Sequence, residues 1–100
     1  MKIEKVSEGK KIILKLDGWL DTLSSPELGK EIEKIEEAEA IVLDFEKLEY
    51  ISSSGLRQVV STQRKANELN AKLSIINVDT EVMSIFSLTG LEKKIDIKEL

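Results

Sequence analysis

Apolar residues follow strand-like spacing in five stretches of this chain. Residues 41–45 form a nearly continuous apolar run that is too short for a helix, as is typical of a strand covered on both faces. Residues 3–7 and 11–16 predict two short strands joined by a tight turn. A further strand is expected at residues 72–78, and residues 94–97 predict a short extended piece near the end of the chain.

Three amphipathic helices are expected between and after these strands. The first begins at residues 24–27, where a hydroxyl cap, a proline and an acid follow one another as at many helix starts. The second follows the central strand and runs to about Asn70, and the third runs from a cap at Asp79 to Gly90. The positions expected to face the core are Leu28, Ile32 and Ile35 in the first helix, Leu56, Val59, Val60 and Leu69 in the second, and Val82, Met83, Ile85 and Phe86 in the third.

The order of these elements predicts an α/β fold. Two strand–helix–strand units favour parallel pairing with right-handed crossovers. The opening hairpin adds an antiparallel pair, so we expect a mixed sheet of about four to five strands with helices packed on it. A chain of 100 residues is about the size of one domain, so residues 1–100 are expected to form a single domain.

Residues 50–56 (Tyr-Ile-Ser-Ser-Ser-Gly-Leu) join the central strand to the second helix, and we call them the serine turn. One interpretation is that its serines only cap the helix, because a serine oxygen accepts a hydrogen bond from a free backbone N–H. The other is that one hydroxyl, with Ser53 as the leading candidate, accepts a phosphoryl group that switches binding. Free N–H groups and a partial positive charge at a helix start accommodate phosphate. The local sequence leaves both interpretations open.

Residues 17–22 are predicted to form a loop with two unusual members. Trp19 is the only tryptophan in the chain, and the favoured interpretation is that it covers the core. The alternative is an exposed contact surface, since tryptophan is enriched at binding hot spots. Asp21 either caps the segment that follows or lies near the serine turn.

Composition narrows the classes of function. The chain is 41% hydrophobic and 34% charged, which is typical of a soluble globular protein. It contains no cysteine and no histidine, which excludes disulfides, thiolate and imidazole metal sites, and Ser-His-Asp catalysis. A formal net charge of −4 argues against nucleic-acid binding. No apolar run approaches the roughly 18 residues that cross a membrane, and the N-terminus lacks a secretory signal, so a cytoplasmic protein is expected. From the missing cysteine and histidine we also expect no catalysis, cofactor or metal of its own.

Four motifs together resemble the anti-sigma factor antagonists, that is, free-standing STAS domains. Gly18-Trp19-Leu20-Asp21 with Ser25-Pro26-Glu27-Leu28 resembles the family's Gly-x-Leu-Asp loop and first helix. Residues 41–45 and the serine turn resemble its central strand and Asp-Ser-Ser-Gly-Leu switch. Residues 73–78 and 88–91 resemble its last core strand and the end of its third helix. Nearly the whole chain is covered, and the resemblance implies a STAS-like fold.

The resemblance also implies a function, that of a bacterial regulator which binds an anti-sigma factor and thereby frees a sigma factor. That partner is usually also a serine kinase; it phosphorylates the first serine of Ser-Ser-Gly, here Ser53, and a separate serine phosphatase reverses the reaction. This chain carries Ser52 where the family commonly has aspartate, so Ser52 and Ser54 are alternative acceptors. A monomer or weak dimer is expected. The partner-binding residues that the resemblance implies are Asp21, Thr22, Ser52, Ser53, Ser54, Gly55, Leu56 and Arg57.

Two other functions are weighed against this one. A non-phosphorylated scaffold, such as an accessory subunit of a transporter or a signalling complex, would use the serine turn only as contact surface. A serine hydrolase fails because the chain has no histidine to activate Ser53.

Overall fold

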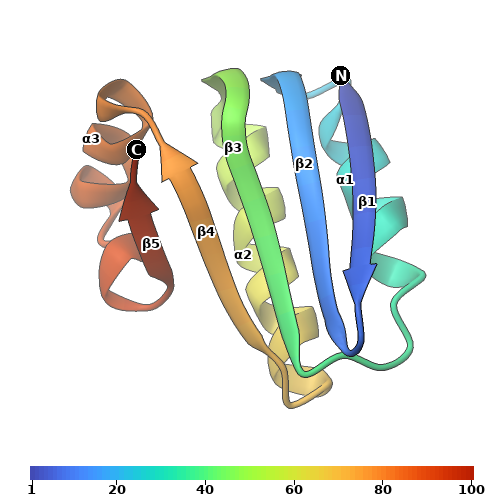
Figure 1. Cartoon of the computed structure of the whole chain (residues 1–100). Helices are drawn as coiled ribbons and strands as arrows, with labels where there is room; N and C mark the ends of the chain where they lie inside the picture. Colours follow the sequence, from blue (N-terminus) through green and yellow to red (C-terminus); the bar gives the residue numbers. More distant parts are fainter.

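A five-stranded sheet forms one layer of the molecule and three helices form the other (Figure 1). The computed structural model describes all 100 residues. The elements in chain order are β1 (Lys2–Glu8), β2 (Lys11–Leu20), α1 (Ser25–Glu33), β3 (Ala40–Ile51), α2 (Ser53–Glu68), β4 (Lys72–Val78), α3 (Thr80–Thr89), the 3₁₀ turn Leu91–Lys93 and β5 (Asp96–Glu99). The predicted elements are all present, and the final extended piece lies a little later than expected, because the short 3₁₀ turn precedes it.

The strands lie side by side in chain order, from β1 at one edge to β5 at the other. β1 pairs with β2 antiparallel, and every later pair is parallel, so the predicted mixed sheet with an N-terminal hairpin is confirmed. Three strand–helix–strand units follow the hairpin, one more than expected, because β5 adds a final parallel strand. The carboxyl ends of β2 to β5 therefore lie at one end of the sheet, the upper end in Figure 1.

The core lies between the sheet and the helices. Leu14, Leu43 and Ile75 are paired neighbours on β2, β3 and β4, and each is completely buried. Phe86 of α3 stacks on Phe45 of β3 with ring centroids 6.1 Å apart, which places α3 on the same face as the other helices. Burial of such side chains, worth about 1.5–3 kcal/mol each, is what holds the two layers together.

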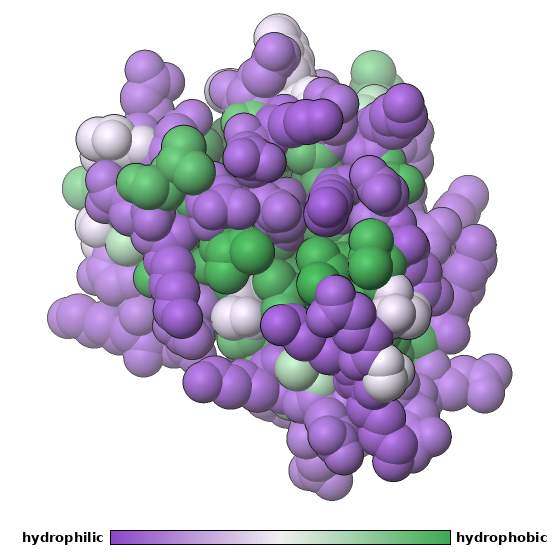
Figure 2. Space-filling model, viewed as in Figure 1, coloured by the Kyte–Doolittle hydropathy of each residue, from purple (hydrophilic) through white to green (hydrophobic).

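The other face of the sheet carries no helix, and Figure 2 shows it as apolar patches between hydrophilic residues. Val42 and Asp44 of β3 point to this face, yet they are only 5% and 9% exposed. The central strand is thus buried on both faces as predicted, although no helix covers this side.

Two local predictions are wrong. Residues 17–20 continue β2 instead of forming a loop, with Gly18 at φ 112° and irregular register on either side of it. Val60 is 41% exposed instead of facing the core, because α2 packs through its smaller residues. The buried residues of α2 are Gly55, Val59, Thr62 and Ala66. No helix of the structure combines the length and apolar character needed to cross a membrane.

Candidate functional site

The candidate site lies where β2 and β3 end and α2 begins. Leu20 and Ile51 are the last paired residues of the two strands, and the Ser52 N–H donates to the Leu20 carbonyl at 3.0 Å. This bond holds the start of α2 beside the loop that follows β2. We call residues 21–24 and 52–57 together the serine site.

Ser52 is the N-cap of α2 and fills the role expected from local chemistry. Its extended backbone (φ −95°, ψ 176°) turns the chain from β3 directly into the helix, so the predicted turn contains only one residue outside regular structure. Its Oγ accepts a hydrogen bond from the Gly55 N–H at 3.2 Å. The cap therefore occupies the hydroxyl of Ser52 and satisfies one backbone donor of the first turn.

Ser54 joins α2 to the loop after β2. Its Oγ lies 3.0 Å from the Thr22 hydroxyl and accepts a hydrogen bond from Arg57 Nη2 at 3.1 Å. Thr22 and Ser54 are 32 positions apart in the chain, so this contact brings two predicted partner-binding segments together. The hydroxyl of Ser54, like that of Ser52, is engaged within the chain.

Ser53 differs from both of its neighbours. It is the first residue of α2, its side chain is exposed, and its hydroxyl forms no hydrogen bond within the chain. An unengaged hydroxyl at a helix start can be reached by an external group without first breaking an internal bond. Three consecutive serines thus have three environments, and only the middle one is free.

Gly55 fixes how closely α2 approaches β2. It is buried, and a Cβ added to it would lie 2.5 Å from the Leu20 carbonyl oxygen and 2.8 Å from Cγ1 of Ile51. Carbon atoms normally contact at about 3.5–4.0 Å, so no larger side chain fits without movement of the backbone. The glycine after the serines is therefore required by packing. Leu56 packs against the core, whereas Arg57 is exposed.

Asp21 organises the loop between β2 and α1, and both roles expected for it hold: it caps the segment that follows, and it lies beside the serine turn because the preceding Leu20 carbonyl accepts the Ser52 N–H. Its Oδ1 accepts from the backbone N–H groups of Ser24 at 3.0 Å and Leu23 at 3.1 Å. The bond from the Ser24 N–H, with smaller help from the Ser24 hydroxyl and the Leu23 N–H, lowers the pKa of Asp21 although partial burial opposes the shift. Asp21 is therefore a capping residue that shapes the loop carrying Thr22.

Ser24 does not cap α1 through its side chain as expected. Its hydroxyl instead donates to the Trp19 carbonyl at 2.6 Å and lies 3.1 Å from Oδ1 of Asp21. The Ser24 Oγ also accepts the Asp21 N–H at 2.9 Å, so the acceptor that a side-chain cap of α1 would need is already used within the loop.

Trp19 is 56% exposed, so the interpretation that it covers the core is wrong. It pairs in register with Tyr50 across β2 and β3, and their ring centroids are 5.3 Å apart. Sequence reasoning did not connect these two aromatic residues. The signal that could have found the pair is that each lies one residue before the last apolar residue of its strand.

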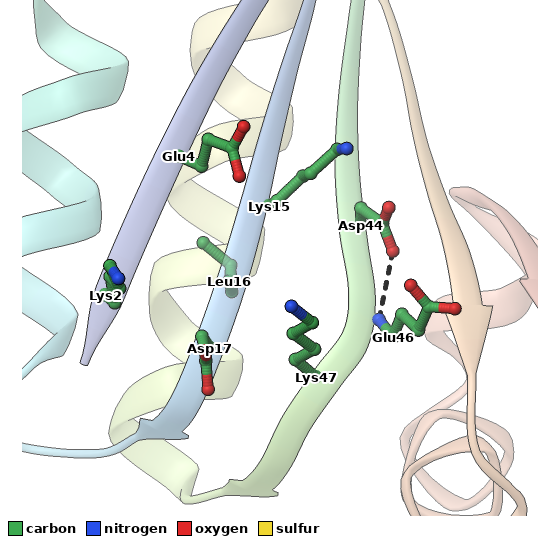
Figure 3. Close-up of a pocket in the computed structure, with 8 residues that line it drawn as sticks. All are labelled: Lys2, Glu4, Lys15, Leu16, Asp17, Asp44, Glu46 and Lys47. Carbon is green, nitrogen blue, oxygen red and sulfur yellow. Dashed lines mark hydrogen bonds between the residues drawn. The ribbon is translucent and has the colours of Figure 1, made fainter.

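A separate pocket of about 170 Å³ lies on the helix-free face (Figure 3). Charged side chains of both signs from β1, β2 and β3 line it, among them Lys15 and Asp44. Asp44 Oδ1 accepts from the Glu46 N–H and from Asn77 Nδ2, both at 3.0 Å, so its position is fixed by the protein itself. No group of three or more histidine, cysteine, aspartate or glutamate residues is placed to hold a metal ion.

Comparison with known proteins places the chain in a family. The model of the STAS domain matches residues 2–99. The anti-sigma-B factor antagonist of Staphylococcus aureus is 27% identical over 101 residues, which cover 99% of this chain and 94% of that protein.

Solved structures agree on the fold. An anti-sigma factor antagonist from Mycobacterium paratuberculosis superimposes with a TM-score of 0.88 at 19% identity, covering 99% of this chain and 86% of the other. The phosphorylated form of the Bacillus cell fate determinant SpoIIAA gives a TM-score of 0.77 at 18% identity, covering 96% of this chain and 90% of the other. The chain belongs to the STAS domain family, and it has the fold of the anti-sigma factor antagonists.

Proposed function

We propose that this protein is an anti-sigma factor antagonist whose binding to an anti-sigma factor kinase is controlled by phosphorylation of Ser53. The observation that carries the proposal is the free, exposed hydroxyl of Ser53 between two serines whose hydroxyls are engaged. The names of its relatives support the antagonist role. A phosphorylated form of a protein with the same fold supports the switch.

The partner supplies the chemistry of phosphoryl transfer. Ser53 Oγ attacks the γ-phosphorus of ATP bound to the kinase, the bond to the leaving oxygen of ADP breaks, and the hydroxyl proton passes to a base of the kinase. This chain contributes the position of the acceptor: the Ser52 cap and the close packing at Gly55 hold the first turn of α2 rigid. It needs no catalytic group of its own.

Phosphorylation opposes binding through charge and hydration. A phosphoserine carries about −1.5 to −2 charges at neutral pH. The start of α2 stabilises that charge by about 0.3–1 kcal/mol, so the fold survives modification. A kinase surface packed over Ser53 must instead desolvate a dianion, and its affinity falls without a conformational change. Released from the phosphorylated antagonist, the kinase returns to its sigma factor; a serine phosphatase resets the switch.

Ser52 in place of the family's aspartate is compatible with this scheme. Serine and aspartate are equally good N-caps, so the helix start is kept while a negative charge beside the acceptor is lost. The engaged hydroxyls of Ser52 and Ser54 make these serines poorer phosphate acceptors than Ser53.

We further propose that the protein acts in the cytoplasm as a single domain that is monomeric or weakly dimeric.

The test uses the purified chain and each anti-sigma factor kinase of the source organism, incubated with ATP and magnesium. Intact mass counts the phosphoryl groups gained by the wild type and by the variants Ser52→Ala, Ser53→Ala and Ser54→Ala. We expect one group on every form except Ser53→Ala. In binding measurements without ATP, Ser53→Asp should bind the kinase weakly and Ser53→Ala should bind as the wild type does.

Two results would overturn the proposal. Phosphorylation of Ser53→Ala to the wild-type extent would show that another residue is the acceptor. Stable binding of a partner with no phosphoryl transfer would indicate the scaffold function instead.

A further inference from the structure

Three large apolar side chains stand exposed beside the serine site. Trp19 and Tyr50 are 56% and 47% exposed, and Leu23 in the loop after β2 is 87% exposed. The two rings touch at an interplanar angle of 55°, so they form one ridge at the ends of β2 and β3. Neither the indole N–H nor the phenol hydroxyl donates a hydrogen bond within the chain, so both polar tips are free. We call Trp19 and Tyr50 the aromatic ridge; Leu23 is a separate exposed side chain in the loop between β2 and α1.

The ridge and Ser53 lie at the same end of the sheet. Leu20 and Ile51 face Gly55 of α2, so Trp19 and Tyr50, one residue before each, stand on the helix-free face. Ser53 follows Tyr50 by three residues, a span of at most about 10 Å. The Trp19 carbonyl accepts the Ser24 hydroxyl, and Thr22 in the same loop contacts Ser54. The loop that carries Leu23 is thus bonded to Trp19 of the ridge through Ser24 and to the start of α2 through Thr22.

A partner that encloses Ser53 also reaches the ridge. A standard protein interface buries about 800 Å² on each side, equivalent to a disc about 16 Å in radius. A footprint of this radius that is centred on Ser53 and wraps over the strand ends reaches Tyr50 and its pairing neighbour Trp19. Exposed tryptophan and tyrosine side by side are the residue types that dominate binding energy in interfaces, because they bury large areas with few rotatable bonds.

We propose that the aromatic ridge, together with Leu23, is the anchor by which the anti-sigma factor kinase holds this protein, while Ser53 is the group it modifies. The inference rests on the proposed function and names the chemistry of the partner surface. That surface is an apolar depression with hydrogen-bond acceptors, carbonyl or carboxylate, at its edge for the indole N–H and the tyrosine hydroxyl. Affinity then comes from the ridge, and control comes from the charge state of Ser53.

The test compares Trp19→Ala, Trp19→Phe and Leu23→Ala with a matched control, Leu88→Ala. Leu88 is 88% exposed on α3, away from the serine site, so it controls for loss of an exposed leucine. Affinity for the kinase that phosphorylates Ser53 is measured by calorimetry without ATP, after thermal unfolding has shown that each variant is folded. Leu23→Ala keeps the test decisive if Trp19→Ala folds poorly, because Leu23 is almost fully solvated in the free protein.

We expect Trp19→Ala to weaken binding about 30-fold or more, as truncation of a hot-spot residue does. Trp19→Phe should recover part of the loss, Leu23→Ala should weaken binding by a smaller factor, and Leu88→Ala should change nothing. If Trp19→Ala and Leu23→Ala bind within twofold of wild type while Ser53→Asp still binds weakly, the anchor is refuted and the proposed function stands. If no kinase binds or phosphorylates the wild-type chain, the proposed function fails, and the anchor fails with it.

Discussion

Gly55 lies where α2 meets the end of β2, and replacing it with alanine tests how tightly that contact is packed. The new Cβ would lie 2.5 Å from the Leu20 carbonyl oxygen, 2.8 Å from Cγ1 of Ile51 and 3.0 Å from Cγ of Leu20. The carbonyl cannot rotate away as a side chain would, and it already accepts the Ser52 N–H at 3.0 Å. Relief of the clash therefore requires α2 and β2 to separate.

Three contributions set the magnitude, two destabilising and one stabilising. Overpacking a tight site costs about 1–3 kcal/mol. Loss or stretching of the hydrogen bond between Ser52 and Leu20 adds about 0.5–1.5 kcal/mol. Alanine is the better helix former by up to about 1 kcal/mol, which offsets part of this cost. We expect a net loss of about 1–3 kcal/mol, which lowers the melting temperature of a domain this size by roughly 4–8 °C for each kcal/mol.

Gly29 is the matched control because it is also a helical glycine. A Cβ there would meet only the side chain of Gln58, with Oε1 at 3.0 Å, and that side chain is free to move. Gly29→Ala should therefore be neutral or stabilising by up to about 1 kcal/mol. The assay is urea unfolding followed by circular dichroism. A Gly55→Ala variant as stable as wild type or more stable would refute the close packing of α2 on β2.

Two further predictions concern the same region. Ser52→Ala removes the cap bond to the Gly55 N–H and should lower the free energy of unfolding in urea by about 1 kcal/mol. Ser53→Ala should leave that free energy within about 0.5 kcal/mol of wild type. Equal losses of stability in the two variants would contradict the different roles of the two hydroxyls. The folded-state pKa of Asp21 lies below the ordinary 3.8, so its ionised form favours folding above that pH, and this contribution disappears as pH falls through the lowered value. The stability difference between wild type and Asp21→Asn, measured by unfolding from neutral pH downward, should shrink over that acid range, and a constant difference would contradict it.

The number and type of elements were predictable because apolar periodicity is a local property of the sequence. The ends of the strands were less predictable. Asp17-Gly18 is typical of a turn, yet this segment continues β2 because Gly18 and Trp19 pair with Leu48 and Tyr50 of β3. Strand pairing with a distant segment overrode the local preference, and Gly18 tolerates the positive φ that the irregular register requires.

Helix burial was also mispredicted for a physical reason. Val60 looked like a core residue by its apolar character, but the buried stripe of α2 includes Thr62 and Ala66. Thr62 is completely buried because its hydroxyl donates to the Gln58 carbonyl at 2.9 Å, which removes the cost of burying it. Hydropathy alone does not reveal a polar group that is satisfied within its own helix.

The position of the serine site was predictable, but which of its serine hydroxyls is free was not. Three serines before a glycine indicate a helix start, but which hydroxyl is free depends on Thr22, 32 positions before Ser54 in the chain, and on the side chain of Arg57. The exposure of Trp19 likewise depends on its pairing with Tyr50. Contacts between distant segments decide these features, and a single sequence does not display them.

The central claim is that Ser53 alone is the regulatory phosphate acceptor. Its most direct test is the intact mass of the protein isolated from its native cell under several growth conditions, followed by fragment mapping of residues 50–57. We expect a form with one added phosphoryl group, located on Ser53, with Ser52 and Ser54 unmodified. A phosphate on Ser52 or Ser54 would refute the role of Ser53, and so would the absence of any phosphate under every condition while a partner remains bound.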